Sequence, residues 1–256
     1  MAMRFWFFGA SDIGAERQSN QDSILFLSGQ VNDSQIGLAV VADGMGGLSD
    51  GEIASRMVVS AFETWWYEEM PDCLNQEPVW KALSDSIDGC ICKVNEQVYQ
   101  FSLQQGNAMG TTLTLAFLID NQILIKNIGD SRGYFIKEGY LSQFTTDDSY
   151  QQKFRDQGYS DEEIQRQGIA QNILTKCVGC REKTEADSQM VWLNSDVLLC
   201  TDGVYQFIEE EKLANFLTNM DFESENYYFD KIHQEIYKNG ARDNWSYVYI
   251  KKMELE

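Results

Sequence analysis

The chain has 256 residues, with 40 acidic and 20 basic side chains and a formal net charge of −20 at pH 7. Such a charge repels nucleic-acid phosphates and anionic lipids, so we expect neither nucleic acid nor a membrane as a partner. With 43% hydrophobic residues, only two prolines and no linker-like stretch or internal repeat, residues 1–256 are interpreted as a single domain.

Short apolar runs rich in β-forming residues predict strands. In chain order they lie at residues 24–27, 36–42, 113–119, 123–128, 133–136, 190–193, 197–200 and 245–250. Two helices are predicted between the second and third runs. The first opens with a capping-box pattern at Ser49 and ends before Pro71, and the second runs from Pro78 to Gly106. A third helical zone is predicted at 209–238.

The segment 147–170 is polar and contains Gly158 and Gly168. We expect it to form short helices in a mobile surface flap. Elsewhere, strands do not alternate regularly with helices, which argues against a doubly wound parallel sheet. An antiparallel core of two sheets with helices outside fits this order better.

Six cysteines are present, including the pair Cys177-x-x-Cys180. Their spacing matches neither a zinc site nor a disulfide framework, so we expect reduced thiols, with a redox role of this pair left open. The apolar run at 5–8 is too short for the core of a signal peptide, and no run reaches the length of a membrane span. The expected location is the cytoplasm.

Aspartates stand where apolar runs end or begin. Asp43, Asp130 and Asp202 each follow a predicted strand, and Asp243 precedes the last one. In antiparallel neighbours the end of one strand lies beside the start of the next, so these four carboxylates are expected to converge at one edge. A single Asp-Gly pair is ordinarily a turn, but the repetition at strand ends favours a metal site over a set of turns.

Converging carboxylates repel one another, and divalent cations relieve that repulsion. Sites made only of oxygen ligands suit Mg²⁺ or Mn²⁺, and two such ions roughly 3.5–4 Å apart activate water for attack on a phosphoryl group. Such a centre needs a basic partner for the phosphate. Arg17 is the candidate, because its planar guanidinium binds two phosphate oxygens at once.

The sequence resembles the metal-dependent protein phosphatases of the type 2C kind. The resemblance extends over residues 12–250 and rests on six motifs in the same order: Arg17-Gln18-Ser19-Asn20-Gln21-Asp22, Ala42-Asp43-Gly44-Met45-Gly46-Gly47, Gly110-Thr111-Thr112, Gly129-Asp130-Ser131-Arg132, Thr201-Asp202-Gly203 and Arg242-Asp243-Asn244. The methionine after Asp-Gly is typical of bacterial members.

The resemblance implies an α+β fold, an αββα sandwich of two antiparallel sheets packed face to face and flanked by helices. It also implies two or three Mn²⁺ or Mg²⁺ ions. Asp43 would bridge two metals as the central catalytic ligand, the Gly44 carbonyl would bind one of them, and Asp202 and Asp243 would hold the first metal.

Three further roles follow from the resemblance. Asp22 would act through a metal-bound water, Asp130 would complete a third metal site with Asp202, and Arg17 would bind the substrate phosphate. Relatives often carry histidines where this chain has Leu48, Asp148 and Gln167. The single histidine, His233, lies in a predicted helix, where a surface or partly buried role is expected. Arg132 is expected to pair with acids at the sheet edge.

The expected function is a protein serine/threonine phosphatase that acts on phosphorylated proteins, including a bacterial-type serine/threonine kinase and its substrates. Two alternatives stay open: a non-catalytic relative that binds phosphoproteins, and a two-metal hydrolase of small phosphate esters. The full set of five aspartates favours an active enzyme, and the absence of a Walker-type motif argues against nucleotide binding.

Overall fold

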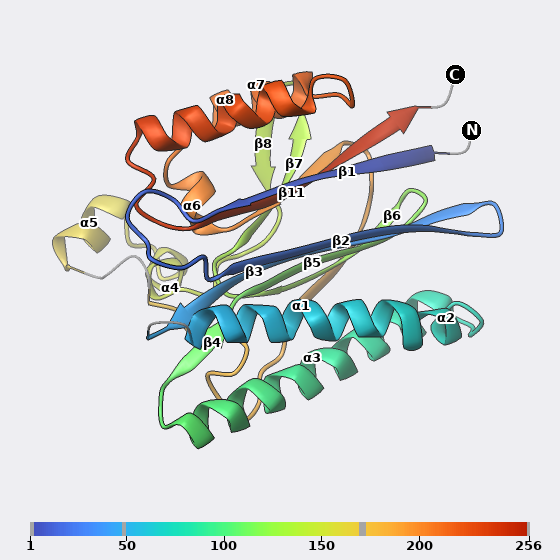
Figure 1. Cartoon of the computed structure of the whole chain (residues 1–256), viewed down its shortest axis with the longest axis horizontal. Coiled ribbons are helices and arrows are strands. Elements are labelled where there is room, and N and C mark those ends of the chain that lie inside the picture. Colours follow the sequence, from blue (N-terminus) through green and yellow to red (C-terminus); the bar gives the residue numbers. More distant parts are fainter. Residues whose placement is uncertain (1–2, 48–49, 169–172, 255–256) are drawn as a thin grey trace.

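The computed structural model describes residues 3–47, 50–168 and 173–254. Two antiparallel sheets stack face to face, and helices cover the outer face of each sheet (Figure 1). This arrangement is the predicted αββα sandwich of the α+β class, so the prediction of fold class is confirmed.

The first sheet contains both ends of the chain. Its strands lie in the order β1 (Met3–Asp12), β11 (Trp245–Glu254), β10 (Asp196–Cys200), β7 (Arg132–Lys137) and β8 (Tyr140–Gln143). The second sheet has the order β2 (Asp22–Val31), β3 (Ser34–Gly46), β5 (Leu113–Ile119), β6 (Gln122–Ile128) and β9 (Asp187–Trp192). The short strand β4 (Met109–Thr111) pairs with the end of β3.

Central strands are apolar on both faces because each sheet is covered on both sides. In β3, Leu38 and Val40 face the helices, whereas Ala39 and Val41 face the other sheet. Side chains alternate between the two faces of a strand, so an uninterrupted apolar run is what such a position requires. This explains why the runs at 36–42, 113–119 and 197–200 predicted strands correctly.

The second sheet is covered by the long helices α1 (Asp50–Glu68) and α3 (Val79–Gln105), joined by the short α2 (Met70–Cys73). The first sheet is covered by α7 (Glu210–Asn219) and α8 (Glu225–Lys238). A short helix α6 (Asp202–Tyr205) follows β10 directly. The predicted long helices are confirmed, while the capping residue Ser49 lies outside the described residues.

The segment predicted as a flap contains the expected short helices, and its role as a mobile flap stays a prediction. Two short helices, α4 (Tyr150–Asp156) and α5 (Asp161–Arg166), follow one another at one end of the sandwich (Figure 1). The α5 helix begins with a complete capping box at Ser160 and Glu163. Residues 169–170 of the predicted flap lie outside the described residues.

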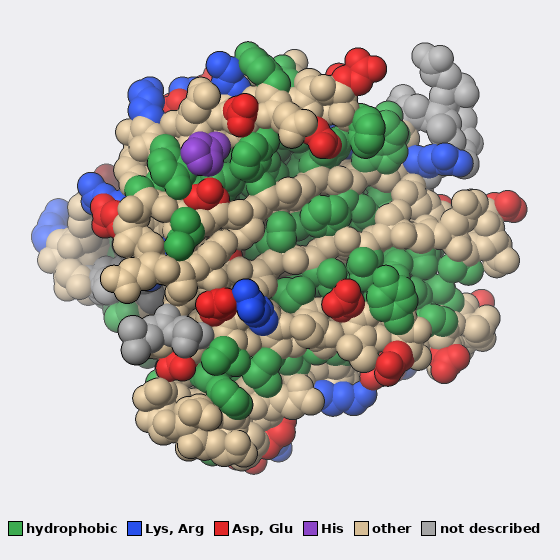
Figure 2. Space-filling model, in the orientation of Figure 1, with side chains coloured by type: hydrophobic (Ala, Val, Ile, Leu, Met, Phe, Trp, Pro, Cys, Tyr) green, Lys and Arg blue, Asp and Glu red, His purple; other side chains and the backbone are tan. Residues whose placement is uncertain are grey.

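Three strands were not predicted from the sequence: β1, β4 and β8. The β1 run has aromatic residues on both faces, with Phe7 toward the other sheet and Trp6 on the opposite face, so no polar–apolar alternation marks it as a strand. Figure 2 shows apolar side chains gathered along the open seam between the edges of the two sheets, where Phe7 stacks on Phe26. The strands β4 and β8 have only three and four residues, too few for a pattern.

The cysteine prediction is wrong for one pair. Cys177 and Cys180 form a disulfide, whereas Cys73, Cys90, Cys92 and Cys200 are free, as expected. A tight turn brings the two sulfurs together, and a spacing rule cannot detect such a turn. Within the described ranges, no helix is both long and apolar enough to cross a bilayer.

Candidate metal centre

Asp22 and Asp43 face each other across the β2–β3 pair. Asp22 is the first residue of β2, and the antiparallel register places it directly opposite Asp43 near the end of β3. Residues opposite each other project from the same face of a sheet, with Cβ atoms about 4.5–5.5 Å apart. Two carboxylates in these positions repel unless a proton or a cation lies between them.

The backbone of Asp43 is fixed by two threonines. Its amide donates to the Thr112 hydroxyl at 2.8 Å, and its carbonyl accepts from the Thr111 hydroxyl at 2.9 Å and the Thr112 amide at 2.9 Å. The Thr112 hydroxyl also bonds to that of Ser131, 2.7 Å away. These contacts connect the end of β3 with the turn that carries Asp130.

Thr201 and Asp202, which follow a strand of the first sheet, lie at the same site as Asp22 and Asp43 of the second sheet. Thr201 follows β10 directly, and its hydroxyl donates to an Asp22 carboxylate oxygen of the other sheet at 2.9 Å. Asp202 starts α6, and one of its oxygens accepts from the Gln206 amide at 2.8 Å. The next residue, Gly203, leaves no room for a Cβ, because that atom would overlap the backbone of Asn244.

Asp243 and Arg17 enter from loops. Nη2 of Arg17 donates to the Asp243 carboxylate at 2.7 Å. Although burial acts to lower it, the pKa of Arg17 is raised by this bond and by the negative charges of Asp43 and Asp202. Asn244 fixes the loop of Arg17, since its amide donates to the Ser19 carbonyl at 3.0 Å and its Oδ1 accepts from the Gln21 amide at 2.9 Å.

Asp130 lies in the turn between β6 and β7. Gly129 precedes it with a φ of 102°, and a Cβ there would lie 2.6 Å from Thr112 Cγ2, so a glycine is needed for the tight turn. Arg132 binds Asp147 through both Nε (3.0 Å) and Nη2 (2.7 Å) and lies over the Tyr205 ring. The prediction that Arg132 pairs with an acid at the sheet edge is therefore confirmed.

The other four aspartates all act electrostatically on Asp43. Burial raises the pKa of Asp43 well above its usual range, and four further carboxylates add to the effect, namely Asp22, Asp202, Asp130 and Asp243. Burial likewise raises the pKa of Asp22 to about 7, of Asp130 to about 7 and of Asp202 to about 6. The structure thus brings together the aspartates that were expected to converge.

The donor set fits hard divalent cations. Asp22 Oδ1 is buried without a hydrogen-bond partner, so an unsatisfied oxygen is present beside Asp43. Across residues 3–47, 50–168 and 173–254, no group of three or more His, Cys, Asp or Glu side chains is placed so that it could hold a metal ion by itself. Interacting but open carboxylates suit Mg²⁺ or Mn²⁺, since these ions keep several waters and take few protein ligands.

Sequence reasoning missed several residues that support the site. The hydroxyl of Thr201 and the amide of Asn244 were recognised only as motif letters, without a role. Gln206 was not noticed, although its spacing of four residues from Asp202 places the two side chains on one helical face. The short helix α6 had no apolar stripe that would have drawn attention to this spacing.

Two of the positions that often hold histidine in relatives can be described here. Asp148 accepts from the Gly129 amide at 3.1 Å and pairs with Lys176 at 3.0 Å, so it holds the turn beside Asp130. Gln167 follows α5 on the surface. Leu48 lies outside the described residues.

His233 is on α8 and is partly exposed, as predicted. Its ring stacks on Tyr237 at 4.2 Å between centroids, and its Nε2 lies 3.8 Å from the Asp12 carboxylate. It also contacts the edge of Trp245, which lies two residues after Asp243. The histidine is therefore nearer to the site than its place in the sequence suggested, but it contacts no aspartate of the centre.

The comparisons with known proteins agree with this geometry. The protein phosphatase 2C family model matches residues 9–235. The serine/threonine phosphatase stp of Listeria monocytogenes is 32% identical over 211 residues, which cover 81% of each chain. The solved Stp1 of Staphylococcus aureus superposes with a TM-score of 0.83 at 25% identity, covering 100% of this chain and 96% of that one.

A further solved structure contains metal. The catalytic domain of the phosphatase PstP, in complex with two manganese ions, superposes with a TM-score of 0.77 at 25% identity, covering 98% of this chain and 100% of that one. The family match spans most of the chain, and the sandwich brings the motif aspartates to one end of its two sheets. The chain belongs to the protein phosphatase 2C family.

Proposed function

We propose that this protein is a metal-dependent phosphatase that hydrolyses phosphoserine and phosphothreonine in proteins. The observation that carries the proposal is the set of five aspartates from both sheets, each close enough to act on the charge of Asp43. A family member that had lost catalysis would have little need to keep five mutually repelling carboxylates at one end of the sandwich. The manganese ions of PstP support Mn²⁺ or Mg²⁺ as the cofactor, with two or three ions per chain.

Each residue has a defined part in this proposal. Asp43 would bridge two ions, the Gly44 carbonyl would complete one ligand set, and Asp202 and Asp243 would hold the first ion. When bound, the ions would supply an acidified water for in-line attack and neutralise charge on the phosphoryl group.

The remaining residues would act around the metals. Asp22 would hold a water through its unpaired oxygen, and Asp130 would join Asp202 at a third site. Arg17 would orient the phosphate, with Asp243 fixing its guanidinium from one side.

The relatives also indicate partners. The Listeria relative is named a serine/threonine phosphatase, which supports phosphorylated proteins as substrates, with a bacterial-type serine/threonine kinase and its targets among them. The net charge of −20 opposes binding to nucleic acid. We place this activity in the cytoplasm, where such kinases have their substrates.

The proposal is tested by hydrolysis of a phosphothreonine peptide with and without Mn²⁺. Metal-free protein should release no phosphate, and Mn²⁺ should restore release. Activity on an aryl phosphate without activity on the peptide would instead favour a hydrolase of small phosphate esters. Full activity after rigorous chelation would end the metal-dependent proposal.

Arg17→Ala should raise KM for a phosphopeptide, because a charge-assisted bidentate contact contributes about 1.5–3 kcal/mol. The kcat/KM should fall roughly tenfold to a hundredfold. Arg17→Lys should restore only part of it, since an ammonium cannot form the planar pair. Arg242→Ala, which removes a 73%-exposed arginine beside the same aspartate, is the matched control. An unchanged kcat/KM in Arg17→Ala would assign Arg17 a structural role through Asp243.

His233→Gln should leave kcat within about threefold, well under 1 kcal/mol of barrier. The ring contacts Tyr237, Trp245 and Asp12 but no aspartate of the centre, so the leaving alkoxide should take its proton from water. The measurement is the pH profile of kcat, which should keep its shape in the variant. A loss of more than about a hundredfold, with Mn²⁺ affinity retained, would make His233 the proton donor.

A further inference from the structure

The Cys177–Cys180 disulfide lies in a loop that is bonded directly to the metal-binding strands. Val178, between the two cysteines, pairs with Thr111 of β4 through two backbone hydrogen bonds of 3.0 Å and 2.8 Å. Thr111 in turn donates its hydroxyl to the carbonyl of Asp43. Only one residue therefore separates the disulfide loop from the central aspartate.

The loop is also fixed from the helical side. The buried Asn95 of α3 accepts from the Gly179 amide at 2.8 Å and donates to the carbonyls of Arg181 and Glu182, each at 3.1 Å. With Asn95 on one side and Thr111 on the other, the loop has little freedom to move as a whole. When the distance between the two sulfur atoms changes, the residues in direct contact with them must therefore move instead.

A change in the positions of the two sulfurs would act first on Gly110. A Cβ on Gly110 would lie 2.7 Å from the Cys180 sulfur and 3.2 Å from that of Cys177, so both sulfurs rest directly on its backbone. Gly110 pairs with Met45 of β3, two residues after Asp43. The strand that carries the candidate metal ligands is thus packed, through one glycine, against the disulfide.

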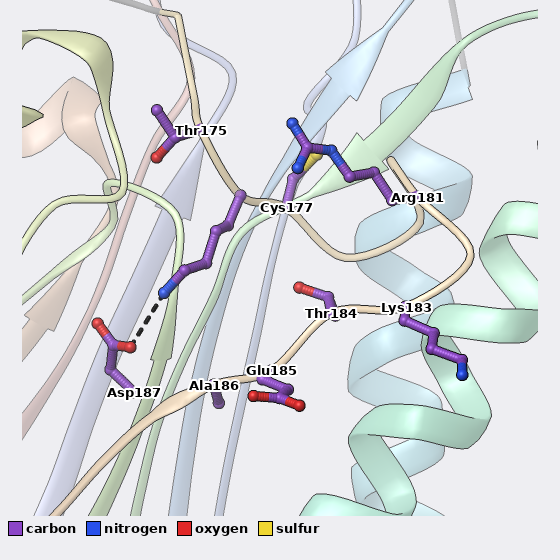
Figure 3. A pocket seen from close by; sticks show the side chains of 9 residues that line it. Thr175, Cys177, Arg181, Lys183, Thr184, Glu185, Ala186 and Asp187 are labelled. Carbon is purple, nitrogen blue, oxygen red and sulfur yellow. Dashed lines mark hydrogen bonds and ion pairs between the residues drawn. The ribbon is translucent and has the colours of Figure 1, made fainter.

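The two cysteines of the disulfide differ in burial. Cys180 is exposed and lines a cavity of about 210 Å³ whose other walls include Met45 and Gly46. Cys177 is buried and lines a second cavity together with Lys176 and Arg181. In Figure 3 the Arg181 side chain reaches back toward Cys177, while Lys183 points away.

We propose that Cys177–Cys180 is a reversible thiol–disulfide site through which a dithiol reductant regulates the metal centre. One thiolate of the reductant attacks the sulfur of Cys180, the exposed residue of the pair, the disulfide breaks, and Cys177 leaves as a thiolate beside the Arg181 guanidinium, whose charge favours it. The second thiol of the reductant then displaces Cys180, so two electrons and two protons pass to the pair and the reductant becomes a disulfide.

Reduction changes the space that the two sulfurs need. A disulfide holds its sulfurs about 2.05 Å apart, whereas two thiols separate to van der Waals distance. With Asn95 and Thr111 holding the loop, the separating sulfurs press on Gly110 and disturb its pairing with Met45. The reduced protein should therefore bind Mn²⁺ less tightly. A consequence for turnover rests on the proposed phosphatase function, but the consequence for metal affinity does not.

The test compares oxidised protein with protein that has been reduced by dithiothreitol and then desalted. Mass spectrometry after denaturing alkylation should find four reactive cysteines in the first state and six in the second. Calorimetry should show Mn²⁺ affinity at least threefold weaker in the reduced state, with a matching fall in kcat/KM for an aryl phosphate.

Two variants complete the experiment. Cys180→Ser should show the weaker Mn²⁺ affinity in both conditions, whereas Cys92→Ser, which removes an exposed free thiol of α3, should keep the full redox difference. Equal Mn²⁺ affinities in the two states, or six reactive cysteines before reduction, would overturn the proposal. If Mn²⁺ affinity differed between the two redox states but no phosphate ester were hydrolysed, the redox proposal would be supported and the proposed phosphatase function would be contradicted.

Discussion

Asp43→Asn is expected to abolish phosphate-ester hydrolysis while the protein stays folded. In its proposed role between two cations, Asp43 needs a negative charge that an amide cannot carry, so kcat should fall at least a thousandfold, about 4 kcal/mol in barrier. The measurement is kcat with saturating Mn²⁺, together with Mn²⁺ affinity by calorimetry. Asp33→Asn, at the exposed turn of the same hairpin, is the matched control and should change neither.

The same variant gives a pH test on metal-free protein. Burial and neighbouring carboxylates raise the pKa of Asp43 above its ordinary value of 3.8, so the folded state loses stability as pH rises from that value through the raised pKa. Asn carries no charge, so metal-free Asp43→Asn should melt at a higher temperature than the wild type at pH 8, and the difference should shrink toward pH 4. A variant that melts lower at pH 8 would contradict the assumed repulsion.

Gly44→Ala should destabilise the protein and remove its metal affinity together. A Cβ on Gly44 would overlap the backbone carbonyl of Gly51 and lie 2.6 Å from the Gln21 carbonyl oxygen, and neither backbone can rotate away. Overpacking of this kind costs about 1–3 kcal/mol or more. The melting temperature should drop by roughly 2–12 °C, and the end of β3 should shift relative to Asp22.

Gly89→Ala is the control for that substitution. Gly89 lies inside α3, and a Cβ there would meet nothing within 4 Å. Replacing a helical glycine by alanine stabilises by about 0.5–1 kcal/mol, so this variant should melt slightly higher and keep full activity. If Gly44→Ala also melted slightly higher and kept full activity, then close packing against the start of α1 would not be the reason for a glycine at position 44.

The sequence predicted the sandwich because its central strands are covered on both faces. Runs such as 36–42 and 197–200 are uninterrupted and apolar, and the residues that follow them are the aspartates of the centre. The positions of Asp43, Asp130, Asp202 and Asp243 could therefore be inferred from strand ends, whereas Asp22 was indicated only by the family resemblance. The edge strand β1 could not be predicted, since it carries aromatic residues on both faces and shows no polar–apolar alternation.

The contacts that hold the aspartates could not be predicted in the same way. The Thr201 hydroxyl meets Asp22 across a separation of 179 residues, and Asn244 meets Gln21 across 223. Such pairs depend on how the two sheets stack, and no local period encodes that arrangement. The disulfide was missed for a local reason. It depends on the backbone conformation of one tight turn, and the spacing of two cysteines does not determine that conformation.

The two sheets are held together differently along their length. Over most of the interface, apolar side chains such as Val41, Leu199 and Val248 pack between them. At the aspartate end, the link is a hydroxyl of one sheet on a carboxylate of the other. Packing of the first kind weakens on cooling, and a link of the second kind weakens when the carboxylate takes up a proton. A change of solvent can therefore loosen one end of the sandwich while the other end stays closed.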